Sequence, residues 1–209
     1  AMLCMAVRAG DAESDLPRPD VLARPAKGEF MRMGRLLEAG AHGILYPRCE
    51  SADEAREVVR WSKFPPLGER GFDSGNADNT YGALPPARYV TRANENTWLA
   101  VQIESPQAAR HAEAIADVEG VDVLFFGPAD YSCLVGKPGQ FMDPDVLEGA
   151  KRTADAAHKA GRIFGTIGLG EDHTEAMLDL GCRLLGCGAD QGMLRSAMQA
   201  ACESRKQGR

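Results

Sequence analysis

Two carboxylates follow neighbouring apolar segments that are expected to be strands. Glu104 comes directly after the apolar run 97–103, and Asp130 follows the apolar run 121–126. In a parallel barrel sheet the carboxyl ends of adjacent strands meet at one edge, about 4.8 Å apart. Glu104 and Asp130 are therefore expected to share one hard divalent cation, with coordination positions left open for substrate and water. Without a cation the two carboxylates would repel each other, and one would have to keep a proton.

Each of these carboxylates, taken alone, could also have an ordinary structural role. A single Glu at a strand end can interact with a helix dipole, and a single Asp in a turn can cap a helix. Their occurrence on successive strands, with Gly127-Pro128 between strand and Asp130, favours a functional site. The other residues expected at this edge are Arg24, Arg48, Cys49, Gln102, Gly168 and residues 188–191.

The elements that must position these residues alternate between short apolar runs and longer amphipathic stretches. Strands are expected over 21–24, 43–47, 97–103, 121–126, 163–167 and 183–187. Helices are expected over 1–9, 29–39, 51–63, 106–118, 143–161 and 172–180, with a final helix from about residue 193. Such alternation predicts a parallel sheet with right-handed crossovers.

Helix starts and one long loop are also visible in the sequence. Ser51 followed by Glu54 is typical of a capping box, and Asp143-Pro144 is typical of an N-cap followed by a first-turn proline. Periodicity stops between residues 65 and 86, where turn residues predict a long loop. The Asp and Asn cluster over 73–79 lacks the spacing of a calcium loop and is interpreted as turn chemistry.

The number of expected strands limits the fold. A (β/α)₈ barrel has eight strand–helix units and typically about 250 residues, whereas this chain has 209 residues and six expected strands. The expectation is an α/β protein with a TIM barrel whose first two strands are missing from this chain, forming a single partial domain over residues 1–209. An open doubly wound sheet is the alternative, but its usual Gly-rich phosphate loop after the first strand is absent.

Composition restricts the partners and the compartment. The net charge is −6, from 24 basic and 30 acidic residues, which argues against a nucleic-acid partner. No apolar run approaches the roughly 20 residues of a membrane helix, and the N-terminal residues do not resemble a signal peptide. The six cysteines are scattered without a C-x-x-C pair and are expected to be reduced thiols. We therefore expect a cytoplasmic protein with no membrane partner.

Two segments around the candidate carboxylates are distinctive: Val-Gln-Ile-Glu-Ser-Pro (101–106) and Gly-Pro-Ala-Asp-Tyr-Ser (127–132). With further matches at residues 23–25, 40–47, 52–56, 64–71 and 117–122, they resemble the HpcH/HpaI family of metal-dependent class II pyruvate aldolases. Enzymes of this family cleave 4-hydroxy-2-oxo acids such as 4-hydroxy-2-oxoheptanedioate and 2-keto-3-deoxy sugar acids. The resemblance extends from about residue 21 to the C-terminus and implies a barrel of the phosphoenolpyruvate/pyruvate type.

The resemblance also implies roles for individual residues. Glu104 and Asp130 would bind Mg²⁺, Mn²⁺ or Co²⁺, and Arg24 would be the catalytic residue that contacts the ketone oxygen of the pyruvate unit. The residues implied to hold the substrate's carboxylate and metal-bound oxygens are Gln102 and the backbone of Gly127, Pro128 and Ala129. A 2-keto acid and an aldehyde would be the substrates. Family members are commonly hexamers with swapped C-terminal helices, and the apolar residues of 193–202 suit such an assembly.

One family feature is absent from the sequence. The family carries an Asp-x-Glu-His segment whose His is the general acid/base, and none of the four histidines here lies in such a segment. His173 follows a strand on the expected side and is either a stand-in or an ordinary first-turn helix residue. The prediction is a carbon–carbon lyase acting through a pyruvate enolate, or a related decarboxylase or condensing enzyme using oxaloacetate. The alternatives are a degenerate or truncated member that binds metal and 2-keto acid, and a bare structural fragment.

Overall fold

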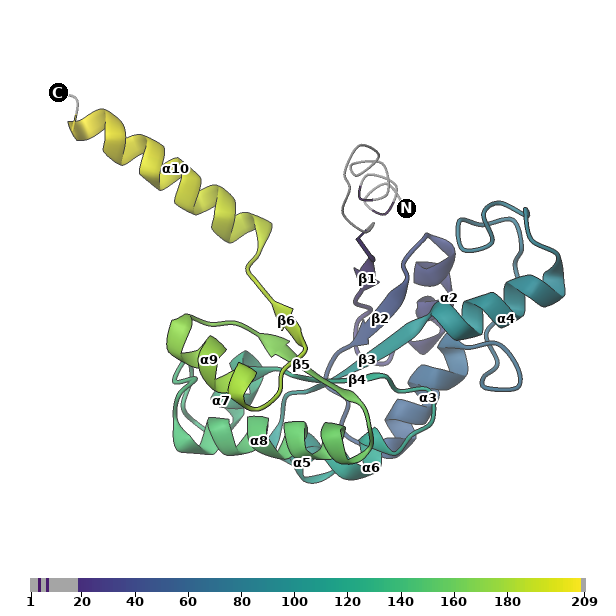
Figure 1. Ribbon diagram of the computed structural model, residues 1–209, viewed down its shortest axis with the longest axis horizontal. Coiled ribbons are helices and arrows are strands. Elements are labelled where there is room, and N and C mark those ends of the chain that lie inside the picture. Colours follow the sequence, from purple (N-terminus) through teal and green to yellow (C-terminus); the bar gives the residue numbers. More distant parts are fainter. Residues whose placement is uncertain (1–3, 5–6, 8–18, 208–209) are drawn as a thin grey trace.

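Six parallel strands form a half-barrel sheet in the computed structural model, which describes residues 4, 7 and 19–207 (Figure 1). The strands are β1 (Leu22–Ala23), β2 (Gly43–Tyr46), β3 (Trp98–Ile103), β4 (Val123–Phe126), β5 (Ile163–Ile167) and β6 (Leu184–Gly186). Each strand pairs with the next one along the chain, and every pair is parallel. This order rules out the doubly wound alternative, because in that fold the strand order reverses at a switch point.

Helices follow the strands along the chain. They are α2 (Phe30–Glu38), α3 (Ala52–Ser62), α4 (Pro86–Asn96), α5 (Pro106–Arg110), α6 (Ala112–Ala116), α7 (Pro128–Leu134), α8 (Pro144–Lys159), α9 (Glu171–Asp179) and α10 (Asp190–Gln207). The last of these, α10, extends away from the rest of the structure (Figure 1). None of the described helices combines the length and the apolar character needed to cross a membrane.

The main hydrophobic core lies between one face of the sheet and the helices. Leu99, Val101 and Ile103 of β3 belong to this core and are fully buried. Side chains alternate between the faces of a strand, so the residues between them point to the other face, where Gln102 lies. Neighbouring positions on that second face, such as Leu45 and Phe125, are only partly buried. The described helices therefore cover one face and leave the other partly open, as in part of a barrel wall.

Several helix expectations need correction. The helix expected over 106–118 is broken at His111, which has non-helical dihedral angles (φ −97°, ψ 5°) and separates α5 from α6. The short helix α7, which begins at Pro128, was not among the expected helices. The helix α4 was also not expected. The helix expected over 1–9 lies outside the described residues, apart from Cys4 and Val7.

The expected helix starts are confirmed, and the structure pairs none of the six cysteines in a disulfide. Ser51 Oγ accepts a hydrogen bond from the Glu54 N–H at 3.2 Å, and Asp143 Oδ1 accepts from the Asp145 N–H at 2.9 Å. All six cysteines are free thiols. Fixed helix starts matter here because each helix leads the chain back to the next strand of the sheet.

Candidate functional site

The ends of β3 and β4 place the two predicted carboxylates at one edge of the sheet. Glu104 directly follows β3 and is buried, whereas Asp130 lies in the first turn of α7 and is exposed. The Gly127 N–H donates to the Ile103 carbonyl at 3.0 Å, which keeps the end of β4 beside the end of β3. Strand pairing therefore brings the segments that carry Glu104 and Asp130 together.

Gly127 packs so closely against Glu104 that no larger residue fits. A Cβ atom added at Gly127 would lie 2.5 Å from Glu104 Oε2 and 2.7 Å from Glu104 Cβ. Such distances are below van der Waals contact. The φ of Gly127 is −104°, so the need for glycine comes from the close approach and not from backbone conformation.

Hydrogen bonds hold both oxygens of Glu104. Oε1 accepts from the backbone N–H of Arg48 at 2.7 Å, and Oε2 accepts from Gln102 Nε2 at 3.3 Å. Arg48 has a φ of +50°, an uncommon conformation for a residue other than glycine. Its carbonyl accepts from Lys27 Nζ at 2.5 Å, and Lys27 forms a salt bridge with Glu54 at 2.9 Å. Contacts from two neighbouring loops thus fix the carboxylate of Glu104.

Three charged groups act on this carboxylate. Burial raises the pKa of Glu104 above its ordinary value, and the negative charge of Asp130 raises that pKa further. The hydrogen bond from the Arg48 N–H and the charges of Arg48 and Arg24 act in the opposite direction. The structure therefore brings the predicted residues Arg24 and Asp130, together with Arg48, within electrostatic range of Glu104.

The donor set fits a hard divalent cation. Gln102 Oε1 is buried and has no hydrogen-bond partner in the described part of the chain, so an acceptor oxygen beside Glu104 is left unsatisfied. Carboxylate and amide oxygens are the ligands that Mg²⁺ and Mn²⁺ prefer. The described residues contain no group of three or more His, Cys, Asp or Glu side chains that could hold a metal. A cation here would rest on two carboxylates, with positions left for a substrate.

The structure limits which of residues 127–129 can donate a backbone hydrogen bond to a ligand. The N–H of Gly127 is already used by the Ile103 carbonyl, and Pro128 has no N–H to donate. Ala129 lies in the first turn of α7, where helical N–H groups lack an acceptor inside the helix. Of these three predicted residues, Ala129 is the one whose backbone N–H is available to a ligand.

The sequence placed Arg48 at the expected edge of the sheet but assigned it no role in the site. Its contribution to the contacts of Glu104 comes from a backbone N–H turned by a positive φ. A backbone donor has no residue-type signature, so only its position two residues after β2 could have indicated it.

His173 is packed inside the fold and not exposed to solvent. It is buried in the first turn of α9, and neither ring nitrogen has a hydrogen-bond partner among the described residues. Its ring packs edge-on against Phe141, with centroids 6.1 Å apart, and burial lowers the pKa of its imidazole. These surroundings support the interpretation of His173 as a packed helix residue.

Known proteins share both the sequence pattern and the fold. The chain is 38% identical over 180 residues to the hydroxypyruvate/pyruvate aldolase of Delftia acidovorans, an alignment that covers 86% of this chain and 66% of the relative. It is 33% identical to the 4-hydroxy-2-oxo-heptane-1,7-dioate aldolase of Shigella sonnei, covering 86% and 68%. The crystal structure of an HpcH/HpaI aldolase from Desulfitobacterium hafniense superposes with a TM-score of 0.83 at 30% identity, covering 90% of this chain and 72% of that one.

The comparisons also show the family of the chain. The chain spans about two thirds of the length of the curated relatives it matches. The matching family model describes the HpcH/HpaI aldolase/citrate lyase family and aligns with residues 18–197. The resemblance noted in the sequence is confirmed: the chain belongs to the HpcH/HpaI aldolase/citrate lyase family.

Proposed function

We propose that this chain carries the metal-binding and pyruvate-binding part of a carbon–carbon lyase. Its reaction is aldol cleavage or condensation of a 4-hydroxy-2-oxo acid through a pyruvate enolate. The observation that carries the proposal is the buried carboxylate of Glu104, which is within electrostatic range of Asp130 and two arginines and lies beside the unsatisfied oxygen of Gln102. The aldolase names of the relatives support it.

Glu104 and Asp130 hold Mg²⁺, Mn²⁺ or Co²⁺ in this proposal. When bound, the cation supplies Lewis-acid chemistry to the oxygens of the 2-oxo acid. The raised pKa of Glu104 supports this assignment, because a nearby cation removes the electrostatic cost of keeping both carboxylates ionised. A bound cation would thus oppose both the burial and the repulsion from Asp130 that raise the pKa of Glu104.

Arg24 and the residues beside Glu104 orient the substrate. Arg24 is exposed at the end of β1, where its fixed positive charge stabilises the ketone oxygen as negative charge develops on it. Gln102 and the Ala129 N–H bind the carboxylate of the pyruvate unit. Gly127 contributes by allowing β4 to approach Glu104, and Pro128 by starting α7 so that Asp130 lies in its first turn.

A second candidate function is binding of metal and 2-oxo acid without full catalysis. The observation that favours it is the packed environment of His173, whose ring nitrogens are buried without partners and so are not placed to move the hydroxyl proton. In this candidate the same residues bind the pyruvate unit, and proton transfer on the aldehyde side is missing.

We further propose that the half-barrel is one partial domain of an eight-stranded barrel, with two strands outside the described residues. The partly open sheet face at Leu45 and Phe125 supports this, because barrel strands bury that face against the opposite wall.

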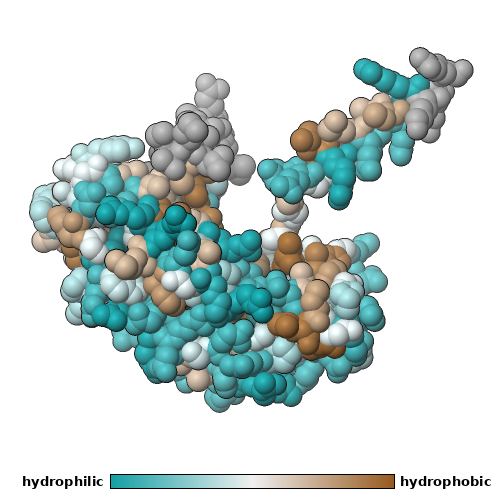
Figure 2. All heavy atoms as spheres, turned by 180° about the vertical axis from the view of Figure 1, so that it is seen from behind, coloured by the Kyte–Doolittle hydropathy of each residue, from teal (hydrophilic) through white to brown (hydrophobic). Residues whose placement is uncertain are grey.

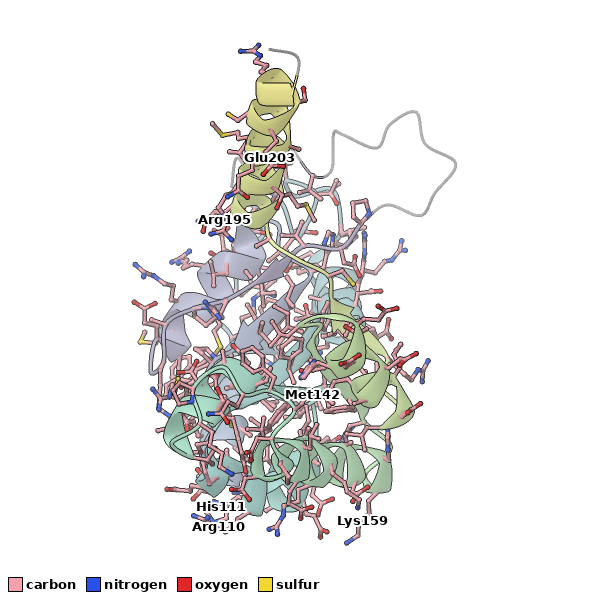
Figure 3. All side chains as sticks on the ribbon, turned by 90° about the vertical axis from the view of Figure 1, so that its left-hand side faces the viewer. Arg110, His111, Met142, Lys159, Arg195 and Glu203 are labelled. Carbon is pink, nitrogen blue, oxygen red and sulfur yellow. The ribbon has the colours of Figure 1, made fainter. Side chains whose placement is uncertain are left out.

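We propose that the chain forms a homo-oligomer, which by family resemblance is a hexamer, through the exposed apolar residues of α10. Met193, Leu194 and Met198 are exposed on this helix, and Figure 2 shows apolar residues along it. Figure 3 shows the helix standing clear of the rest, with Arg195 and Glu203 on it. A second copy would bury these side chains.

The two candidate functions are separated by a cleavage assay. Pyruvate release from 4-hydroxy-2-oxoheptanedioate is followed with and without Mn²⁺, alongside Mn²⁺ binding by electron paramagnetic resonance. A lyase releases pyruvate only with Mn²⁺, and Asp130→Asn abolishes both release and binding. Mn²⁺ binding without pyruvate release supports the second candidate. Absence of Mn²⁺ binding contradicts both.

A further inference from the structure

Strand order gives the candidate site an uneven distribution of charge. Arg24 follows β1, Arg48 lies just beyond β2, and Glu104 follows β3, with Asp130 beyond β4. Since the strands are paired in chain order, two cationic side chains lie on one side of the site and two carboxylates on the other. A ligand held at Glu104 and Asp130 therefore extends towards arginines.

The backbone of Arg48 is fixed beside the carboxylate of Glu104. Its N–H donates to Glu104 Oε1, and its carbonyl accepts from Lys27 Nζ. The next residue, Cys49, donates its N–H to the Gln102 carbonyl at 3.0 Å. Three contacts on two consecutive residues hold the base of the Arg48 side chain at the site.

The guanidinium of Arg48 has no structural role of its own in the described part of the chain. It is exposed and makes no hydrogen bond or salt bridge to another described residue. By contrast, the arginines of the adjacent helices α2 and α3 each pair with a carboxylate. These paired arginines are Arg32, Arg35, Arg56 and Arg60. An unpaired guanidinium beside a carboxylate site is free to bind an acidic group of a ligand.

We propose, on the basis of the proposed function, that Arg48 binds the second carboxylate of a dicarboxylic 2-oxo acid whose oxo-acid end lies at Glu104 and Asp130. A guanidinium binds a carboxylate through two parallel hydrogen bonds, which is the geometry that favours arginine over lysine. Neighbouring strand ends are about 4.8 Å apart, a distance of the order that a short dicarboxylate spans. Arg24 serves the ketone, so Arg48 is the cation left for the second carboxylate.

Two five-carbon ligands isolate this contact. In 2-oxoglutarate the chain ends in a carboxylate, and in 2-oxopentanoate it ends in a methyl group, while the oxo-acid end is identical. Dissociation constants are measured by calorimetry at low salt on the Mn²⁺-loaded full chain, for wild type, Arg48→Gln, Arg48→Lys and Arg56→Gln. All four proteins keep the backbone N–H that holds Glu104. Arg56→Gln removes an exposed arginine of α3 and serves as the control.

The wild type and Arg56→Gln are expected to bind the diacid about tenfold more tightly than the monoacid, which corresponds to about 1.4 kcal/mol. Arg48→Gln is expected to bind both ligands equally, and Arg48→Lys to keep part of the preference. A wild type without preference, or an Arg48→Gln variant that keeps it, overturns the proposal. Equal weakening of both ligands by Arg48→Gln also overturns it, because Arg48 would then serve the oxo-acid end. Failure of both ligands to bind wild type contradicts the proposed function itself.

Discussion

Replacing Gly127 by alanine tests how Glu104 is held. The added Cβ would lie 2.5 Å from Glu104 Oε2 and 2.7 Å from Glu104 Cβ. Gly127 has a negative φ, so alanine introduces no backbone strain there and its effect is the steric one. Either the Glu104 side chain leaves its present position, or β4 moves away from β3.

The size of the effect follows from the packing. Inserting a methyl group into a well-packed site costs about 1–3 kcal/mol. If Glu104 absorbs the shift, it loses its hydrogen bonds from Arg48 and Gln102 and its place opposite Asp130. A loss of about 1.4 kcal/mol in cation binding is a tenfold rise in the dissociation constant. We expect Mn²⁺ affinity to fall at least tenfold.

The assay combines Mn²⁺ titration by electron paramagnetic resonance with urea unfolding of the same preparations. Gly71→Ala is the matched control, because a Cβ at Gly71 meets no atom within 4 Å and its φ is not positive. The reasoning is refuted if Gly127→Ala binds Mn²⁺ as tightly as the control. A variant that is less stable but keeps full Mn²⁺ affinity also refutes it, because Glu104 would not have moved.

Three further predictions concern the surroundings of the site and the rest of the fold. Lys27→Met removes the hydrogen bond from Lys27 to the Arg48 carbonyl. Because the Lys27 side chain is exposed, we expect only a few-fold loss of Mn²⁺ affinity, measured by titration. An unchanged affinity would contradict the role of Lys27 in positioning the Arg48 backbone. His173→Leu removes a buried imidazole whose pKa is lower in the folded state than in the unfolded state. As the pH decreases below about 6.5, the unfolded wild type binds a proton more readily than the folded wild type, so the free energy of unfolding decreases. The variant lacks this imidazole, and its free energy of unfolding is expected to decrease less. Urea unfolding at pH 7.5 and 5.5 measures this, and parallel losses would contradict it. Arg70→Met breaks the buried ion pair with Asp78 (2.7 Å) and is expected to lower the free energy of unfolding by about 3 kcal/mol in urea, with Mn²⁺ affinity unchanged; a loss below about 1 kcal/mol would contradict this.

Local rules predicted much of the fold because they act within a few residues. The N-caps at Ser51 and Asp143 are confirmed as side-chain hydrogen bonds to backbone N–H groups. The return bond of the expected capping box differs, because Glu54 Oε2 accepts from the N–H of Glu50 and not from that of Ser51. The strand expected over 163–167 has those bounds in the structure. The break at His111 was not predicted, because the helical pattern of apolar residues continues through it, and α7 was missed because a Gly-Pro pair is also typical of turns.

The parts of the candidate site that could be predicted are those where a charged residue stands at the end of an expected strand. Glu104 and Asp130 are charged residues at the ends of apolar runs, and the rule that strand ends share one edge placed them together. The contact from the Arg48 N–H was not predicted, because it depends on a backbone conformation that the residue type disfavours. The use of the Gly127 N–H by Ile103 likewise depends on strand register, which composition does not reveal.

The central claim is that Glu104 and a divalent cation activate the methyl group of pyruvate. The direct measurement is exchange of the pyruvate methyl protons for deuterium, followed by NMR with and without Mn²⁺. Wild type and the exposed control Glu95→Gln are expected to exchange only with Mn²⁺, and Glu104→Gln is expected to lose the exchange. Exchange that persists without Mn²⁺, or in Glu104→Gln, would contradict the account, as would a Mn²⁺-loaded wild type that leaves the methyl group unlabelled.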